Sequence, residues 1–287
     1  MRTFFIMVLF LLTHSIKITA QQFQVFDSED KTPLSYVMIT SIHSNKYIYT
    51  DKEGVFRISQ DEYNSTDRLR FQMLGYETLI LGVIDMRDSI LLSPSTFSIA
   101  EVIVHPRKNV ILGFAMEKDK KYKNVIFGSP PFEPFRIAVF IANDIKTTGH
   151  VSKLLFRYQF TGPDLYIVRP QIYAVSDDGT PGPTLLNKSE VISLSGNGIL
   201  EILCEQGVIF PENGLFVGFD FIDILDIAGN SINQPSNQEC QIPLLFTKTY
   251  SNACTFLSWN RTHTWEVISI SNSKKQPNAA FGLNLIY

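Results

Sequence analysis

The sequence predicts an all-β protein of two domains. Apolar and polar residues alternate with a period of two along most of the chain, and clusters of Gly, Pro, Asp and Asn separate the alternating segments. No window sustains the apolar stripe of an amphipathic helix. At 287 residues the chain has room for two domains of ordinary size.

Residues 21–105 predict a small β-sandwich. Asp51 and Gly54 lie between alternating apolar residues, and this spacing is typical of a hairpin turn. Glycine reaches positive φ without a Cβ clash, and aspartate binds the backbone of its own turn. Further strands are predicted at residues 69–71, 90–92 and 99–104.

The order of short motifs in this region points to a known family. The motifs are residues 23–27, Pro33-Leu34 followed by 36–39, the Thr-Asp-x-x-Gly-x-Phe run at 50–56, Gly75-Tyr76 and Glu101-Val102. Together they resemble the carboxypeptidase-regulatory-like domain, a transthyretin-like β-sandwich found at the N-terminus of TonB-dependent outer-membrane receptors. The resemblance implies a fold and an exported location. It implies no catalytic residue.

The first 20 residues predict a secretory signal peptide. Arg2 precedes the apolar run 4–12, and Ala20 is a small residue at the expected cleavage site. The run is shorter than the roughly 20 residues that a spanning helix requires, and the alternative is a retained anchor. No later segment is apolar enough to cross a membrane, so we expect an exported mature chain without a transmembrane segment: periplasmic, outer-surface or secreted.

Residues 106–134 predict a linker and the lead-in to the second domain. Residues 118–123 are rich in lysine, and residues 128–134 are broken by proline. The basic cluster could contact an acidic surface, or it could be a solvated face.

Residues 135–287 predict a jelly-roll-like antiparallel β-sandwich. Residues 152–160 alternate strictly, and Pro170 within the strand predicted at 166–175 suggests an edge position or a bulge. Further strands are predicted at 191–194, 199–203, 215–221, 244–247, 265–270 and 281–286. The turns around residues 178–182 and 210–214 resemble those of an exported bacterial β-sandwich with no defined activity.

Four amphipathic aromatic residues are the candidates for ligand binding: Trp259, Trp265, Tyr166 and Tyr173. Each combines a flat apolar ring with a polar tip, a combination favoured at binding surfaces. Trp259 is expected in a loop. The alternative is a tryptophan that closes one end of the sandwich.

Asp220, Asp223 and Asp226 form a cluster of carboxylates. Such a cluster could bind Ca²⁺, or it could end a strand and cap its turn. We expect no other cofactor. Cys240 and Cys254 flank an apolar segment and could form a disulfide, whereas Cys204 is expected to pack as a small apolar side chain.

These patterns favour a non-enzymatic binding or structural protein of a bacterial envelope, whose partner is a glycan or an envelope protein. The formal net charge of −3, with 18% charged residues, gives no signal for nucleic acid. Gly-x-Ser-x-Gly and His-Glu-x-x-His are absent from the sequence. The alternatives are a metal-assisted hydrolase with its site in the second domain, and an accessory of an outer-membrane transporter.

Overall fold

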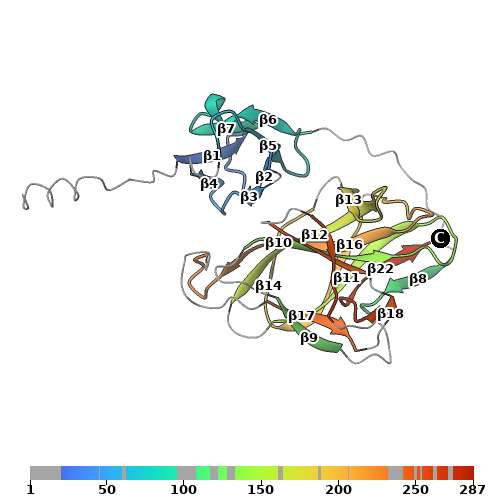
Figure 1. Cartoon of the computed structure of the whole chain (residues 1–287). Coiled ribbons are helices and arrows are strands. Elements are labelled where there is room, and N and C mark those ends of the chain that lie inside the picture. The colour runs from blue at the N-terminus through green and yellow to red at the C-terminus, as the bar shows by residue number, and fades with distance from the viewer. Residues whose placement is uncertain are drawn as a thin grey trace, which may run out of the picture.

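The structure is a computed structural model that describes residues 21–44, 46–59, 63–95, 108–116, 122–127, 133–160, 164–186, 189–205, 207–231, 242–248, 251–252, 254–260, 264–270 and 274–287. These segments form two β-sandwiches (Figure 1), and the predicted all-β fold class is confirmed. No helix in this part of the chain has the length and hydropathy that a membrane crossing requires. The predicted signal peptide lies outside the described residues.

The first sandwich packs a sheet in the order β4-β1-β7 against a sheet in the order β3-β2-β5-β6. Its elements are β1 (Gln21–Asp27), β2 (Met38–Ser41), β3 (Tyr47–Tyr49), β4 (Val55–Ile58), β5 (Arg68–Gln72), β6 (Leu79–Gly82), the short 3₁₀ helix η1 (Val83–Asp85) and β7 (Ser89–Leu92). β1 and β7 run parallel, and β1 and β4 run antiparallel. The two sheets share one apolar core, in which the Phe56 ring lies 5.3 Å from that of Phe23 and 5.8 Å from that of Phe71.

Asp51 and Gly54 form the predicted tight turn, but the turn does not close a hairpin. The Asp51 carboxylate accepts hydrogen bonds from the backbone N–H groups of Glu53 (3.0 Å) and Val55 (2.8 Å). Gly54 has a φ of 75°, and a Cβ there would lie 2.9 Å from the carbonyl oxygen of Val25. The expected hairpin is wrong because β3 pairs with β2 and β4 pairs with β1, so the turn carries the chain from one sheet to the other.

The second sandwich packs a large sheet, in the order β13-β12-β16-β10-β19-β20 with β14 also paired to β12, against a small sheet in the order β15-β11-β22-β8. The strands of the large sheet are β10 (Phe135–Ile141), β12 (Leu165–Val175), β13 (Pro181–Thr184), β14 (Ile192–Leu194), β16 (Leu215–Leu225), β19 (Thr255–Trp259) and β20 (Glu266–Val267). Those of the small sheet are β8 (Asn109–Gly113), β11 (His150–Gln159), β15 (Asn197–Leu203) and β22 (Phe281–Ile286). Two short pairs complete it: β9 (Tyr122–Phe127) with β17 (Ile242–Thr247), and β18 (Ser251–Asn252) with β21 (Lys275–Gln276).

The predicted linker at residues 106–134 is wrong in part, because two of its segments are strands of the second sandwich. β8 pairs antiparallel with β22, and β9 pairs antiparallel with β17. The sequence did not predict β9, because Tyr122 and Lys123 belong both to this strand and to the lysine-rich cluster. The second sandwich therefore begins before residue 135.

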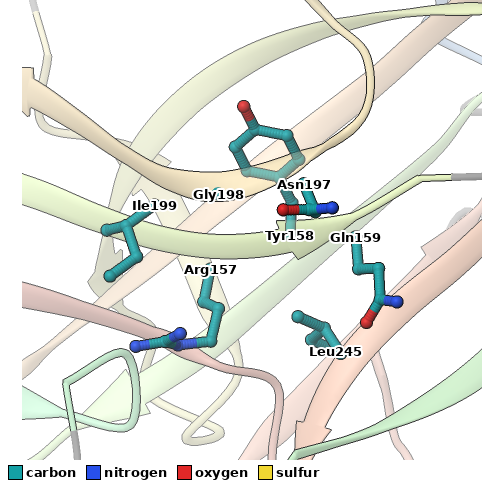
Figure 2. A pocket seen from close by; sticks show the side chains of 7 residues that line it. All are labelled: Arg157, Tyr158, Gln159, Asn197, Gly198, Ile199 and Leu245. Carbon is teal, nitrogen blue, oxygen red and sulfur yellow. The ribbon is translucent and has the colours of Figure 1, made fainter.

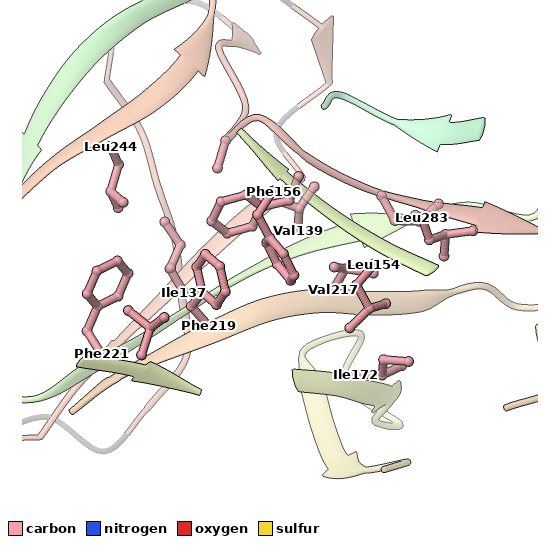
Figure 3. Packing of buried hydrophobic residues seen from close by; sticks show 14 of the residues in the cluster. Ile137, Val139, Leu154, Phe156, Ile172, Val217, Phe219, Phe221, Leu244 and Leu283 are labelled. Atoms are coloured by element: carbon pink, nitrogen blue, oxygen red, sulfur yellow. The ribbon is translucent and has the colours of Figure 1, made fainter. Parts of the chain in front are cut away.

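Aromatic rings fill the space between the two sheets of the second sandwich (Figure 3). The ring of Phe156, from the small sheet, stacks 3.9 Å from that of Phe219, from the large sheet. Phe135 and Phe221 stack at 4.7 Å on neighbouring strands. All four side chains are buried, so they couple the two layers.

Pro170 occupies a gap between two partners of β12. β14 pairs with residues 166–168 and β13 with residues 173–175, and a bulge lies between Ile167 and Val168. The Pro170 carbonyl accepts a hydrogen bond from the Ser189 hydroxyl at 2.5 Å. Since the N and C=O of one residue point to the same side of an antiparallel strand, the missing N–H also faces this gap and removes no ladder bond.

We expect Phe219→Ala to lower the free energy of unfolding by roughly 3–5 kcal/mol, because it leaves a cavity between the two sheets. Urea denaturation followed by circular dichroism measures the loss. Ile227→Ala is the control, since Ile227 is 86% exposed; its effect should stay below about 0.5 kcal/mol. Equal effects of the two variants would contradict this packing.

Candidate binding site

Two of the four candidate aromatic residues contribute to packing. The Tyr166 ring stacks 4.0 Å from that of Phe160 and is buried, so Tyr166 cannot stack on a ligand in this structure. Trp259 ends β19 instead of lying in a loop, and its ring lies 5.0 Å from that of Phe135. It packs against the core at one end of the sandwich, which is the alternative given above.

Tyr173 and Trp265 come together on the outer face of the large sheet. Their ring centroids lie 5.5 Å apart with an edge-on geometry. Tyr173 is buried, and its hydroxyl donates a hydrogen bond to Asp220 at 2.5 Å. The prediction that Tyr173 lies at an open binding surface is therefore wrong, because the first domain covers this face.

A row of charged side chains crosses this face. Arg169 of β12 lies opposite Asp220 of β16, which lies opposite Arg136 of β10. We call Arg169, Asp220 and Arg136 the charged row. Arg169 is 5% exposed and Asp220 is 4% exposed, and Arg136 is half-buried, so most of the row is withdrawn from water. Buried charges of this kind require close polar partners.

The first domain supplies several of these partners. The Arg169 guanidinium donates to the Tyr36 carbonyl at 2.5 Å and lies 5.9 Å from the centroid of the Tyr49 ring. Arg136 lies between two rings, 4.9 Å from that of Tyr47 and 5.1 Å from that of Trp265. These are cation–π distances.

A backbone contact also joins the two domains. The Tyr47 N–H donates to the side-chain oxygen of Asn260 at 2.9 Å. In Figure 1, β3 is the strand of the first sandwich that approaches the large sheet. Tyr36 and β3 therefore form the docking surface of the first domain.

Two tyrosines beside the charged row, and Arg136 within it, have raised pKa values. Burial, followed by the charge of Asp220, raises the pKa of Tyr173 well above 10. Burial also raises the pKa of Tyr49, followed by Asp220 and Tyr47. For Arg136, burial acts to lower the pKa, but Tyr47, Tyr173 and Asp220 together raise it. The phenols stay protonated and the guanidinium stays charged.

Asp220 and Asp223 each bind protein donors. Asp220 accepts from Tyr173 and from the side-chain amide of Gln171 at 3.1 Å. Asp223 accepts from the Ser231 hydroxyl at 2.7 Å and from the Ile224 N–H at 2.8 Å. Both carboxylates are therefore occupied within the fold.

Asp226 caps an exposed turn, accepting from the N–H groups of Ala228 (2.9 Å) and Asn230 (2.8 Å). Within the described ranges, no group of three or more His, Cys, Asp or Glu side chains is placed to hold a metal ion. The three aspartates thus do not assemble into a calcium site in this structure, and the turn-capping interpretation describes Asp226.

The disulfide predicted between Cys240 and Cys254 involves a residue outside the described part, because Cys240 is not among the described residues. The Cys254 sulfur lies 3.2 Å from the carbonyl oxygen of Asn252. Burial raises the pKa of the Cys254 thiol, followed by the charge of Asp144. Cys204 packs against the core of the second sandwich, as predicted.

An open pocket lies on the opposite side of the second sandwich, on the outer face of the small sheet. Its volume is about 630 Å³, and we call it the Arg157 pocket. The residues that line it are Arg157, Tyr158, Gln159, Asn197, Gly198, Ile199 and Leu245. Figure 2 shows Arg157, Gln159 and Leu245 on one side of the strands and the Tyr158 ring on the other.

Strand register brings the polar lining together. Gln159 lies opposite Asn197, and Arg157 lies opposite Ile199, across β11 and β15. Alternation along each strand sends these side chains to the outer face. Leu245 joins them because the Ala280 N–H donates to the Leu245 carbonyl while the Ala280 carbonyl accepts from the Arg157 N–H. A smaller pocket of about 380 Å³ lies in the first domain around His43 and Asp67.

None of the four predicted aromatic residues lines the Arg157 pocket. The residues that do line it were missed because an arginine, two amides and two aliphatic side chains form no sequence motif. The alternation in residues 152–160 placed Arg157 and Gln159 on the solvent-exposed face of their strand. This alternation was the sequence signal for these two pocket residues.

We expect Tyr47→Ala to release the first domain from the large sheet. Tyr47 is 2% exposed and is not part of the first domain's apolar core, so the substitution removes the Arg136 contact without hollowing that core. The loss of ring burial and of the cation–π contact should weaken docking by roughly 2–4 kcal/mol. Small-angle X-ray scattering should then give a larger radius of gyration, whereas Arg57→Ala, on an exposed part of the first domain, should leave it unchanged. Identical scattering of both variants and the wild type would count against the docked arrangement.

The stability contribution of Asp223 should fall as pH rises. Burial raises its pKa above 3.8, more than its hydrogen bonds to Ser231 and Ile224 lower it. The folded state then binds the proton more tightly, so the contribution is fully present below the unfolded pKa and is lost as pH rises through the folded pKa. We expect the difference in unfolding free energy between wild type and Asp223→Asn to decline as the pH rises above the ordinary pKa of aspartate.

Asp226→Asn is the matched control for this measurement. Backbone hydrogen bonding from Asn230 lowers the pKa of Asp226, so its contribution is present above the unfolded pKa and is lost as pH falls through the folded one. The two variants should therefore show opposite slopes against wild type in urea titrations at a series of pH values. Slopes of the same sign would refute the assignment.

Comparison with solved structures finds a similarity to the clostridial cysteine protease Cwp84 after cleavage of its propeptide. The two are 11% identical with a TM-score of 0.38, and the match covers 60% of this chain and 41% of that chain. The match therefore spans less than half of the protease chain. No curated protein matches the sequence.

A family model described as CarboxypepD_reg-like domain matches residues 24–104. These residues include every strand of the first sandwich apart from the start of β1. The resemblance inferred from the motifs between residues 23 and 102 is confirmed: residues 24–104 are a CarboxypepD_reg-like domain.

Proposed function

We propose that this chain is an exported, non-enzymatic binding protein of a bacterial envelope, and that it binds a glycan in the Arg157 pocket. The observation that carries the proposal is the pair of amides, Gln159 and Asn197, directly opposite each other at the mouth of an open pocket. Both side chains are exposed. An amide offers donors and an acceptor at once, which matches neighbouring sugar hydroxyls that both donate and accept.

Two aliphatic side chains support the same proposal. Ile199 is 36% exposed and lies beside the amides, and Leu245 lines the other wall. Ile199 offers most of an apolar patch for the C–H face of a sugar ring, because Leu245 is only 8% exposed. Binding pockets commonly combine such a patch with a few placed polar groups.

The pocket also remains accessible when the two domains are docked. The first domain covers the outer face of the large sheet, and the pocket lies on the outer face of the small sheet. A ligand therefore reaches the pocket without domain rearrangement.

A metal-assisted hydrolase was expected to use Asp220, Asp223 and Asp226, and these carboxylates bind protein donors. A role beside an outer-membrane transporter stays a prediction from the first domain's family. An envelope-protein partner, the other partner of the binding-protein hypothesis, stays a prediction as well. The predicted export also remains a prediction.

We expect Gln159→Ala and Asn197→Ala each to weaken glycan binding by about three- to tenfold, the range for one hydrogen bond. A glycan array with the mature chain identifies a ligand, and isothermal titration calorimetry measures the loss. Asn109→Ala is the matched control, because Asn109 is an exposed asparagine on β8, at the other edge of the same sheet.

A chelator distinguishes the two classes of function. Binding in the Arg157 pocket should be unchanged by EDTA, since the pocket's lining contains no carboxylate or histidine. Glycan turnover that is abolished by EDTA would overturn the proposal in favour of the hydrolase.

A further inference from the structure

Arg157 is held in a fixed orientation at the pocket. Its Nε donates a hydrogen bond to the Ala115 carbonyl at 3.1 Å, and its guanidinium carbon lies 4.6 Å from the centroid of the Tyr122 ring. The Tyr122 hydroxyl in turn donates to the carbonyl oxygens of Phe114 (2.9 Å) and Ala115 (3.1 Å). The arginine side chain is therefore ordered before any ligand arrives, which lowers the entropic cost of binding.

The terminal nitrogens of this guanidinium remain available. Among the described residues, neither Nη atom of Arg157 has a hydrogen-bond or ion-pair partner. The other six lining residues carry no formal charge. Glu201, on the same face of β15, is paired with Lys153 at 2.8 Å. The pocket therefore holds one positive charge that no lining residue compensates.

We infer that the ligand of the Arg157 pocket carries a carboxylate, so that it is an acidic glycan containing uronate residues. This inference rests on the proposed function. The two Nη atoms form a planar fork that binds the two oxygens of a carboxylate in parallel. Gln159, two residues along β11 on the same face, then binds hydroxyls of the sugar that bears this carboxylate, or of its neighbour.

The test compares oligogalacturonate with its fully methyl-esterified form, because the two differ in charge but not in sugar or linkage. Calorimetry with the full mature chain should show about tenfold or tighter binding of the free acid, the effect of one charge-assisted hydrogen-bond pair. Affinity for the acid should fall as NaCl is raised, and affinity for the ester should not. Arg157→Gln should abolish the preference for the acid.

Two matched variants exclude simpler explanations. Lys108→Gln removes an exposed positive charge beside β8, at the other edge of the same sheet and outside the pocket, and should leave the preference intact. Arg157→Lys keeps the charge without the fork, and should retain salt dependence while losing most of the affinity gain. Circular dichroism melting curves check that each variant folds.

The outcomes separate this inference from the proposed function. Equal binding of acid and ester overturns the carboxylate inference and leaves glycan binding in place. Failure of every glycan on the array to bind overturns both. If free acetate at matched concentration displaces the oligosaccharide, or an acidic peptide binds as tightly as the acid, the assignment of an acidic glycan is wrong.

Discussion

The charged row on the large sheet determines how the two domains are arranged. Arg169, Asp220 and Arg136 lie side by side, with Arg169 and Asp220 buried and Arg136 half-buried, a state that is unfavourable without partners. Tyr173 and Gln171 satisfy Asp220 from within the second sandwich. The arginines depend on the first domain as well, through the Tyr36 carbonyl and the Tyr47 and Tyr49 rings. An isolated second sandwich would expose this row. The sequence of the second domain is therefore suited to a second sandwich that has the first domain docked on it.

This docking gives the two outer faces of the second sandwich different roles. The large sheet presents a polar and aromatic face, whose composition suits ligand binding, but the first domain occupies it. On the outer face of the small sheet, the Arg157 pocket combines an uncompensated cation with two amides and two aliphatic side chains. At the pocket, the charged side chain is thus accessible to solvent, whereas the charged side chains of the charged row are mostly buried. That difference separates the proposed binding site from a structural contact.

Much of the fold follows from local patterns. Alternation in residues 152–160 predicts β11, and Asp51 with Gly54 predicts a tight turn, because both depend on neighbours in sequence. The pairing of that turn's strands could not be predicted, since it depends on which sheet each strand joins. β9 was missed for a related reason: within the described residues it pairs with β17 alone, and its lysine-rich start has the composition of a solvated segment. The β-propensity of residues is a property of one segment, whereas strand pairing depends on two segments.

The proposed binding site was less predictable than the fold, because strand register creates it. Tyr166 and Tyr173 lie in one strand, yet Tyr166 faces the core and Tyr173 packs with Phe216 and Trp265 on the outer face of the large sheet. Gln159 and Asn197 become neighbours through the β11–β15 register, and Leu245 arrives from a third strand. Arg157 is anchored by Ala115 and Tyr122, which both lie in the stretch expected to be a linker. Because this stretch was predicted to be a linker, the residues that orient the guanidinium were not identified from the sequence. The aromatic residues were selected instead because the chemistry of an aromatic side chain can be judged from a single residue. A site built from amide, aliphatic and arginine side chains can be recognised once the structure shows that these side chains share one face of a sheet.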